Sequence, residues 1–154
     1  NKEIALQALL QKEVVLLTWY RGGWCPYCNI YLRGLDAFAK DYPNVHFIAL
    51  SPEKTSKAVM TTKENALGLT VVSDTNNKIA KQFGITYILP PEIQKAFKGR
   101  IDVADYNGES SFELPLAATY IIDKDGMIIY DFLKADYKKR AAFSDIASVL
   151  DSLE

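Results

Sequence analysis

Two cysteines lie three positions apart in the segment Trp24-Cys25-Pro26-Tyr27-Cys28, and they are the only cysteines in this 154-residue chain. A Cys-x-x-Cys pair that follows a strand and opens a helix can alternate between a dithiol and a disulfide. At the helix end, free backbone amides and the helix dipole stabilise a thiolate, which lowers the thiol pKa from about 8.5. One turn further along, the second cysteine can attack the mixed intermediate and close the ring. We therefore predict redox chemistry at Cys25 and Cys28.

The same cysteines could instead be unreactive, or they could supply half of a zinc site. A structural zinc ion takes four ligands, and His46 is the only histidine that could add to the two sulfurs. His46 opens a strand of buried character, where a histidine is more often structural than a metal ligand or a general base. We expect neither a metal nor another cofactor.

The pair is held between a buried strand over residues 14–20 and a helix over residues 26–40. The strand is rich in β-branched and aromatic residues, and Gly22-Gly23 ends it. Pro26 lies at the first helical position, where proline is well tolerated. One face of the helix is apolar and consists of Cys28, Leu32, Leu35 and Ala39.

The rest of the chain alternates strands and helices. Residues 5–12 form a short helix or an irregular lead-in. Strands are predicted at residues 45–50 and 69–72, and two more, at 118–123 and 127–132, form a hairpin across Asp123-Lys124-Asp125-Gly126. Helices are predicted at 55–65, at 76–83 with Gly84 as C-cap, and at 144–153 with Ser144 as N-cap.

Residues 87–114 are irregular apart from a short predicted helix at 92–97. A connection of this length indicates a functional or family-specific insertion before the last hairpin. The order of elements predicts an α/β fold with a central mixed β-sheet flanked by helices, close to the thioredoxin architecture. We expect one domain over residues 1–154.

Composition excludes several classes of protein. Eighteen basic and nineteen acidic residues leave a net charge near zero, without the basic stripe of a nucleic-acid binder. The short cluster Lys138-Lys139-Arg140 is interpreted as a solvated surface. No apolar run reaches the roughly 18–20 residues that span a bilayer, so no membrane contact is expected. The cytoplasm is the default compartment, and the periplasm would follow if a signal sequence preceded Asn1.

The segment from Trp19 to Asn29 resembles the peroxiredoxin-like members of the AhpC/TSA family (alkyl hydroperoxide reductase/thiol-specific antioxidant) in the thioredoxin superfamily. The likeness continues in Glu113-Leu114-Pro115, in residues 118–126, and in Ala135-Asp136-Tyr137 with Arg140. This resemblance implies a thioredoxin-like fold and an antioxidant-type, thiol-dependent oxidoreductase that reduces peroxides or disulfides. It also implies a thioredoxin- or glutathione-type reductant, and it leaves a homodimer open.

The chain departs from that family at three positions. The family pattern Pro-x-x-x-Thr-x-x-Cys falls on Arg21, Cys25 and Cys28, and an arginine expected before the later strand falls near Ala117. Arg21 or Arg33 could supply the missing charge. Peroxiredoxin counting favours Cys28 as nucleophile, whereas the position at the helix end favours Cys25, and we expect Cys25.

Several neighbours are candidates for a substrate groove. Trp24 is expected to form a wall of the site, and Pro26-Tyr27 between the cysteines resembles glutaredoxins. Pro115 and Thr119 belong to the later strand region, where thioredoxin-like proteins place a proline beside the redox pair. Two other functions stay open: a protein-disulfide reductase without peroxidase activity, and a redox-inert binding domain on the same fold.

Overall fold

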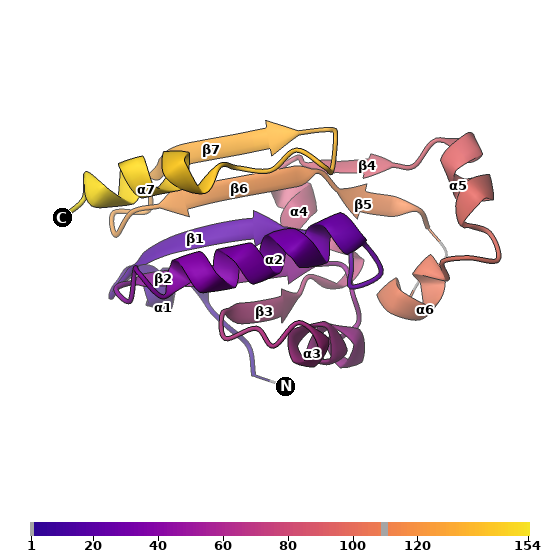
Figure 1. The fold of residues 1–154 in the computed structure, drawn as a ribbon, viewed down its shortest axis with the longest axis horizontal. Coiled ribbons are helices and arrows are strands. Elements are labelled where there is room, and N and C mark those ends of the chain that lie inside the picture. The colour runs from indigo at the N-terminus through magenta and orange to yellow at the C-terminus, as the bar shows by residue number, and fades with distance from the viewer. Residues whose placement is uncertain (1, 109–110) are drawn as a thin grey trace.

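A central five-stranded sheet organises the computed structural model, which describes residues 2–108 and 111–154 (Figure 1). β1 (Val14–Trp19) pairs in parallel with β2 (Val45–Ser51), and β2 pairs in parallel with β3 (Thr70–Ser73). On its other side β1 pairs antiparallel with β6 (Ala117–Ile122), which pairs antiparallel with β7 (Ile128–Lys134). The predicted mixed sheet and the thioredoxin-like fold class are confirmed.

Helices cover both faces of this sheet. α2 (Pro26–Ala39) and α7 (Phe143–Asp151) pack on one face, and α1 (Leu6–Leu10) and α4 (Lys78–Gln82) pack on the other. α3 (Thr55–Glu64) packs beside the edge strand β3. Side chains alternate between the two faces along β1, so the faces have separate cores: Val15, Leu17 and Trp19 toward α1 and α4, and Leu16 toward α2 and α7.

The last helix does not begin where its capping pattern predicted. Ala142 is the N-cap and the helix starts at Phe143, so the prediction of Ser144 as N-cap is wrong. The Phe143 ring stacks on Phe38 and Tyr31 of α2, with ring centroids 5.3 and 5.4 Å apart. Aromatic packing against α2 therefore sets the start of the helix, ahead of the local preference of serine for a cap.

The helix predicted at 76–83 is split. It begins as the 3-10 turn η1 (Thr75–Asn77), in which Asn76 has a left-handed backbone, and continues as α4. The Asp74 carboxylate accepts hydrogen bonds from the amides of Ile79 and Ala80 and so caps the helix from outside. Gly84 follows with φ +68°, as its predicted place at the helix end requires.

The segment predicted to be irregular contains a second, two-stranded sheet. β4 (Thr86–Ile88) pairs antiparallel with β5 (Glu113–Pro115), and between them lie α5 (Pro91–Phe97) and α6 (Val103–Asn107). α5 matches the helix predicted at 92–97, whereas three-residue strands are too short to show a period in the sequence. Residues 109–110 lie outside the described residues. Figure 1 shows β4, β5, α5 and α6 extending past one end of the main sheet.

Two further structural findings bear on function. No helix in residues 2–108 and 111–154 is long and apolar enough to cross a membrane. Across the same residues, no group of three or more histidine, cysteine, aspartate or glutamate side chains is placed to hold a metal ion.

Candidate active site

Cys25 and Cys28 lie at the start of α2 and are joined by a disulfide, with 5.3 Å between their Cα atoms. Cys25 is the N-cap of the helix and Pro26 is its first residue, as the sequence predicted. The Cys25 sulfur accepts a hydrogen bond from the Cys28 amide at 3.4 Å, so one of the free helix amides points at it. Both side chains are buried, with exposed fractions of 2% for Cys25 and 0% for Cys28.

The loop that leads to the pair needs both of its glycines. A Cβ on Gly22 would clash with the Trp24 indole, and a Cβ on Gly23 would clash with the Thr61 hydroxyl. The Gly23 amide also donates a 2.6 Å hydrogen bond to the Glu53 carboxylate. Gly22-Gly23 therefore does more than end the strand, because it lets the loop lie directly against side chains that a larger residue would push away.

Beneath this loop lies Glu53, a fully buried carboxylate that the sequence analysis missed. It accepts hydrogen bonds from the Tyr20 hydroxyl at 2.8 Å and from the Gly23 amide, and also from the hydroxyls of Thr61 and Ser51. Burial raises the pKa of Tyr20 well above its usual range, and the charge of Glu53 raises it further, so the phenol stays a donor. An acidic residue two positions after the end of a buried strand was the available signal.

Arg140 brings a positive charge to the pair. Its Nη2 lies 3.1 Å from the Cys28 sulfur, while Nη1 donates to the Trp19 carbonyl and Nε to the Tyr137 carbonyl. The interpretation of Lys138-Lys139-Arg140 as a solvated surface is therefore wrong for Arg140, which is partly buried, and holds for the two exposed lysines. Chain topology hid this contact, because Arg140 follows β7 and reaches α2 only in the folded state.

Burial lowers the pKa of Arg140 to about 10; the nearby Tyr31 hydroxyl counteracts this shift and the charge of Arg21 adds to it. The guanidinium is nevertheless charged at neutral pH. A desolvated cation in contact with a sulfur favours the thiolate form of that sulfur once the disulfide is reduced.

Arg21, four residues before Cys25, is buried under aromatic rings. Its guanidinium carbon is 3.9 Å from the centroid of the Tyr137 ring and 4.8 Å from that of Trp24. The Trp24 ring in turn packs edge-on against Phe97 of α5, at 5.4 Å between centroids. Trp24 thus packs between Arg21 and Phe97 of the insertion, and its part as a wall of the site stays a prediction.

The other predicted groove residues are divided between two places. Pro26 and Tyr27 are exposed beside the cysteines, and the Tyr27 ring meets that of Tyr137 at 5.9 Å. Pro115 is buried in β5 opposite Thr86, and no peptide bond of the described chain is cis. Thr119 is buried in β6, and its hydroxyl contacts that of Thr18 at 2.9 Å. No hydrogen bond joins either Pro115 or Thr119 to the cysteines, so their part in a groove stays a prediction.

Arg33 does not supply the missing charge. It is exposed on α2, and its guanidinium donates to the side-chain oxygen of Asn65 at 2.6 Å. Of the two candidate arginines, Arg21 is the one that contacts Trp24 and whose charge acts on Arg140, and its role at the cysteines stays a prediction.

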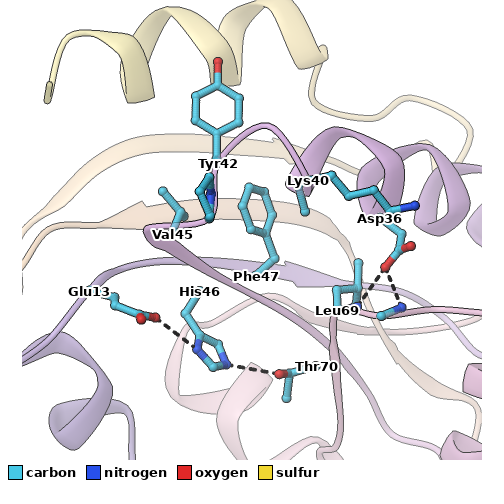
Figure 2. A pocket seen from close by; sticks show the side chains of 12 residues that line it. Glu13, Asp36, Lys40, Tyr42, Val45, His46, Phe47, Leu69 and Thr70 are labelled. Atoms are coloured by element: carbon cyan, nitrogen blue, oxygen red, sulfur yellow. Dashed lines mark hydrogen bonds and ion pairs between the residues drawn. The ribbon is translucent and has the colours of Figure 1, made fainter.

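His46 lies far from the cysteines, at the start of β2 (Figure 2). Because β1 and β2 are parallel, this end of the sheet is opposite to the end that leads into the redox loop. In Figure 2 the imidazole points between Glu13 and Thr70, beside a cavity of about 430 Å³. Its Nδ1 lies 3.3 Å from the Glu13 carboxylate, and its Nε2 lies 3.1 Å from the Thr70 hydroxyl. His46 is thus a side chain with its own partners and is not positioned to act as a base at Cys25 or Cys28.

Comparison with solved structures places this fold among peroxiredoxins. The peroxidoxin BcpB of Mycobacterium tuberculosis superposes with a TM-score of 0.73 at 18% identity, over 97% of this chain and 85% of that one. A 2-Cys peroxiredoxin of Plasmodium vivax superposes with a TM-score of 0.69 at 16% identity, over 97% of this chain and 82% of that one. A secreted disulfide oxidoreductase of Mycobacterium tuberculosis superposes with a TM-score of 0.61 at 15% identity, over 94% of this chain and 85% of that one. At these identities the likeness establishes the fold.

Comparison by sequence establishes the family. No curated protein matches the chain. The model of the AhpC/TSA family, however, matches residues 1–131, which is most of the sequence. The expected resemblance is confirmed, and with the Cys25–Cys28 pair at disulfide distance it identifies a thiol-dependent oxidoreductase whose family uses peroxide substrates and thiol reductants. The chain belongs to the AhpC/TSA family.

Proposed function

We propose that this enzyme is a two-cysteine thiol peroxidase in which Cys28 attacks the hydroperoxide and Cys25 resolves the product. The observation that carries the proposal is the 3.1 Å contact between Arg140 Nη2 and the Cys28 sulfur. A guanidinium at that distance stabilises a thiolate and can also hold a peroxide oxygen that gains negative charge in the transition state. Cys28 also occupies the position that peroxiredoxin counting gives to the peroxidatic cysteine.

The helix end gives Cys25 a weaker stabilisation. Its sulfur receives one amide hydrogen bond at 3.4 Å, whereas Cys28 meets a full positive charge. Both sulfurs are buried in the disulfide form, so accessibility does not separate them. From the sequence we expected Cys25 to attack and Cys28 to resolve. The proposal exchanges these two roles, and experiment can distinguish the two assignments.

The proposed cycle balances over three steps. The Cys28 thiolate attacks the distal oxygen of a hydroperoxide, the O–O bond breaks, and the alkoxide takes a proton, leaving an alcohol and a Cys28 sulfenic acid. The Cys25 thiol then attacks the sulfenic sulfur, which releases water and forms the Cys25–Cys28 disulfide. Two external thiols reduce this disulfide and leave as a disulfide themselves.

We further propose that a thioredoxin- or glutathione-type thiol performs the last step and that the cytoplasm, where such thiols are kept reduced, is the compartment. A homodimer is proposed through β7, because it is an edge strand with a free row of backbone groups. Light scattering of the purified protein tests the dimer, and cell fractionation tests the compartment.

Single-cysteine variants test the central proposal. Reduced Cys25→Ser should consume one equivalent of hydrogen peroxide and accumulate a sulfenic acid that a dimedone probe labels at residue 28. Reduced Cys28→Ser should react slowly, at the rate of an ordinary thiol. The reverse pattern would assign attack to Cys25.

Insulin reduction separates the second candidate function, a disulfide reductase without peroxidase activity. The observation that favours it is the exposed Tyr27, 48% accessible beside the buried pair, on which a protein partner could dock. Reduction of insulin with no fast reaction toward peroxide in the wild type would establish this function instead.

A further inference from the structure

Arg21 is a buried cation without an anionic partner. Its exposed fraction is 5%, and within residues 2–108 and 111–154 it makes no hydrogen bond and no ion pair. Its Nε is fully buried and has no acceptor. Buried arginines are normally paired with a carboxylate, because removing the charge from water is costly and an unpaired charge leaves that cost uncompensated.

Aromatic rings compensate for only part of this cost. Tyr137 and Trp24 lie over the guanidinium, and Phe97 is further off at 5.8 Å. Cation–π attraction is worth about 0.5–2 kcal/mol, and a ring face accepts no strong hydrogen bond from the N–H groups at the edge of the guanidinium. The rings of Tyr137, Trp24 and Phe97 form an aromatic cage that fixes the position of Arg21 but leaves the buried Nε donor without an acceptor.

A second donor without an acceptor lies on Trp24, one of the rings of this cage. The indole Nε1 of Trp24 is buried and has no acceptor, and Trp24 is the ring 4.8 Å from the guanidinium. Trp24 and Arg21, which lie one and four residues before Cys25, thus each carry a buried N–H donor without an acceptor, and their side chains are in contact. Each of these donors could donate to a carboxylate oxygen.

The described surroundings hold three cations and one carboxylate, and that carboxylate, Glu53, is hydrogen-bonded to Tyr20, Gly23, Ser51 and Thr61 rather than to Arg21. Arg140 is close enough for the charge of Arg21 to contribute to its lowered pKa, and Lys138 Nζ lies 5.9 Å from the Tyr137 ring. None of these three cations takes part in an ion pair within the described chain. A Cys28 thiolate can balance Arg140 through its direct contact, which leaves Arg21 to be balanced by something else.

We propose that Arg21, with the Trp24 indole, binds a carboxylate carried by one of the two co-substrates, the hydroperoxide or the reducing thiol. This inference rests on the proposed function for its kinetic consequence, whereas the binding itself does not depend on turnover. It also gives the insertion a role, since Phe97 of α5 supports Trp24 from behind. A carboxylate bound here would hold the rest of its molecule beside Cys25 and Cys28.

Direct binding is tested on the oxidised protein, which needs no activity. Hexanoate should shift the indole N–H resonance of Trp24 in a saturable manner, and hexanamide, of the same size without the charge, should not. Arg21→Met should abolish the shift and Arg21→Lys should retain part of it. Arg100→Met removes an arginine charge from the exposed surface and should behave as wild type. Equal shifts with hexanoate and hexanamide, or an unchanged shift in Arg21→Met, would overturn the proposal.

Kinetics then identify which co-substrate carries the carboxylate. Linoleic acid hydroperoxide is compared with its methyl ester, and 3-mercaptopropionate with its methyl ester. In one of the two pairs kcat/KM should favour the acid by about tenfold, and Arg21→Met should reduce that ratio to near one. No preference in either pair contradicts the inference. Absence of hydrogen peroxide reduction by the wild type contradicts the proposed function instead, so the two failures are separate results.

Discussion

The Cys28 sulfur and the Arg140 guanidinium act together, since each makes the charge of the other less costly. Burial alone disfavours the arginine charge, and a buried thiol on its own resists ionisation. Side by side at 3.1 Å, the thiolate and the guanidinium offset each other's desolvation. In the family pattern a threonine falls on the position of Cys25 and an arginine falls near Ala117. In this chain the positive charge at Cys28 comes from Arg140, which follows β7.

Arg140→Met should therefore raise the pKa of the Cys28 thiol toward the ordinary value of about 8.5. The thiolate absorbance in the ultraviolet, followed against pH in a Cys25→Ser background, measures this pKa directly. The rate of peroxide reduction at neutral pH should fall about tenfold for each unit by which the pKa rises above neutrality. Arg140→Lys should restore part of the shift, because it returns the charge without the fork of donors. An unchanged thiol pKa in Arg140→Met would contradict the role given to Arg140.

Glu53→Gln should destabilise the fold by about 1–3 kcal/mol, the cost of buried hydrogen-bonding groups left without partners. The amide of glutamine carries two N–H groups, and they would face the donors of Tyr20, Gly23 and Thr61. Urea unfolding of the oxidised protein measures the loss. The control is Glu92→Gln, which removes the same charge from an exposed position on α5. Equal stability of the two variants would show that the Glu53 network does not anchor the loop.

At the scale of elements, residues that repeat with a period were predictable and residues that meet through tertiary contact were not. The strand before Gly22-Gly23, the helix from Pro26 and the hairpin closed by Gly126 all have local signals, and the structure confirms them. The roles of Glu53 and Arg140 depend on which elements lie together, and a single sequence does not contain that information. The same reason explains why α7 begins at Phe143 rather than behind Ser144.

The insertion is fastened to α3 by a charged contact. Asp105 of α6 lies 2.6 Å from Lys57 Nζ, and the Lys54 amide donates to the Tyr106 carbonyl. The hydrogen bond from Lys57 lowers the pKa of Asp105 below its ordinary value of 3.8. A lowered carboxyl pKa contributes stability above the unfolded pKa, and this contribution disappears as the pH falls through the folded pKa.

Asp105→Asn should consequently weaken the protection of the α6 amides against hydrogen exchange at neutral pH, and the difference from wild type should vanish in acid, once the pH has fallen below the lowered pKa of Asp105 in the folded state. Protection factors of residues 103–107, measured by NMR, follow this contact. The effect should be small and should decrease with added salt, because the Asp105 side chain is exposed and Lys57 is only partly buried. A difference that persists in acid would mean that the aspartate acts through its shape rather than its charge.

On the scale of the whole molecule, charge is distributed unevenly even though its sum is close to zero. The formal net charge is −1, yet three cations, Arg21, Lys138 and Arg140, lie around the redox pair and form no ion pair in the described chain, against the single buried carboxylate of Glu53. Such a local excess attracts anions to one end of the molecule. The assignment of residues 1–154 to one domain stays a prediction, and a single cooperative urea transition is the expected result.

This local charge predicts a salt dependence that differs between substrates. Over roughly 20 to 500 mM salt the Debye length shrinks from about 20 Å to a few ångström, so attraction between the site and an anionic substrate is screened. The kcat/KM for a carboxylated co-substrate should fall over this range, while the value for its methyl ester should stay nearly constant. Lys138→Gln should flatten the slope for the acid, because it removes an exposed charge that attracts the substrate, whereas Lys124→Gln in the β6–β7 turn should not. Parallel slopes for acid and ester would mean that the cations act only on the cysteine sulfurs and contribute nothing to substrate capture.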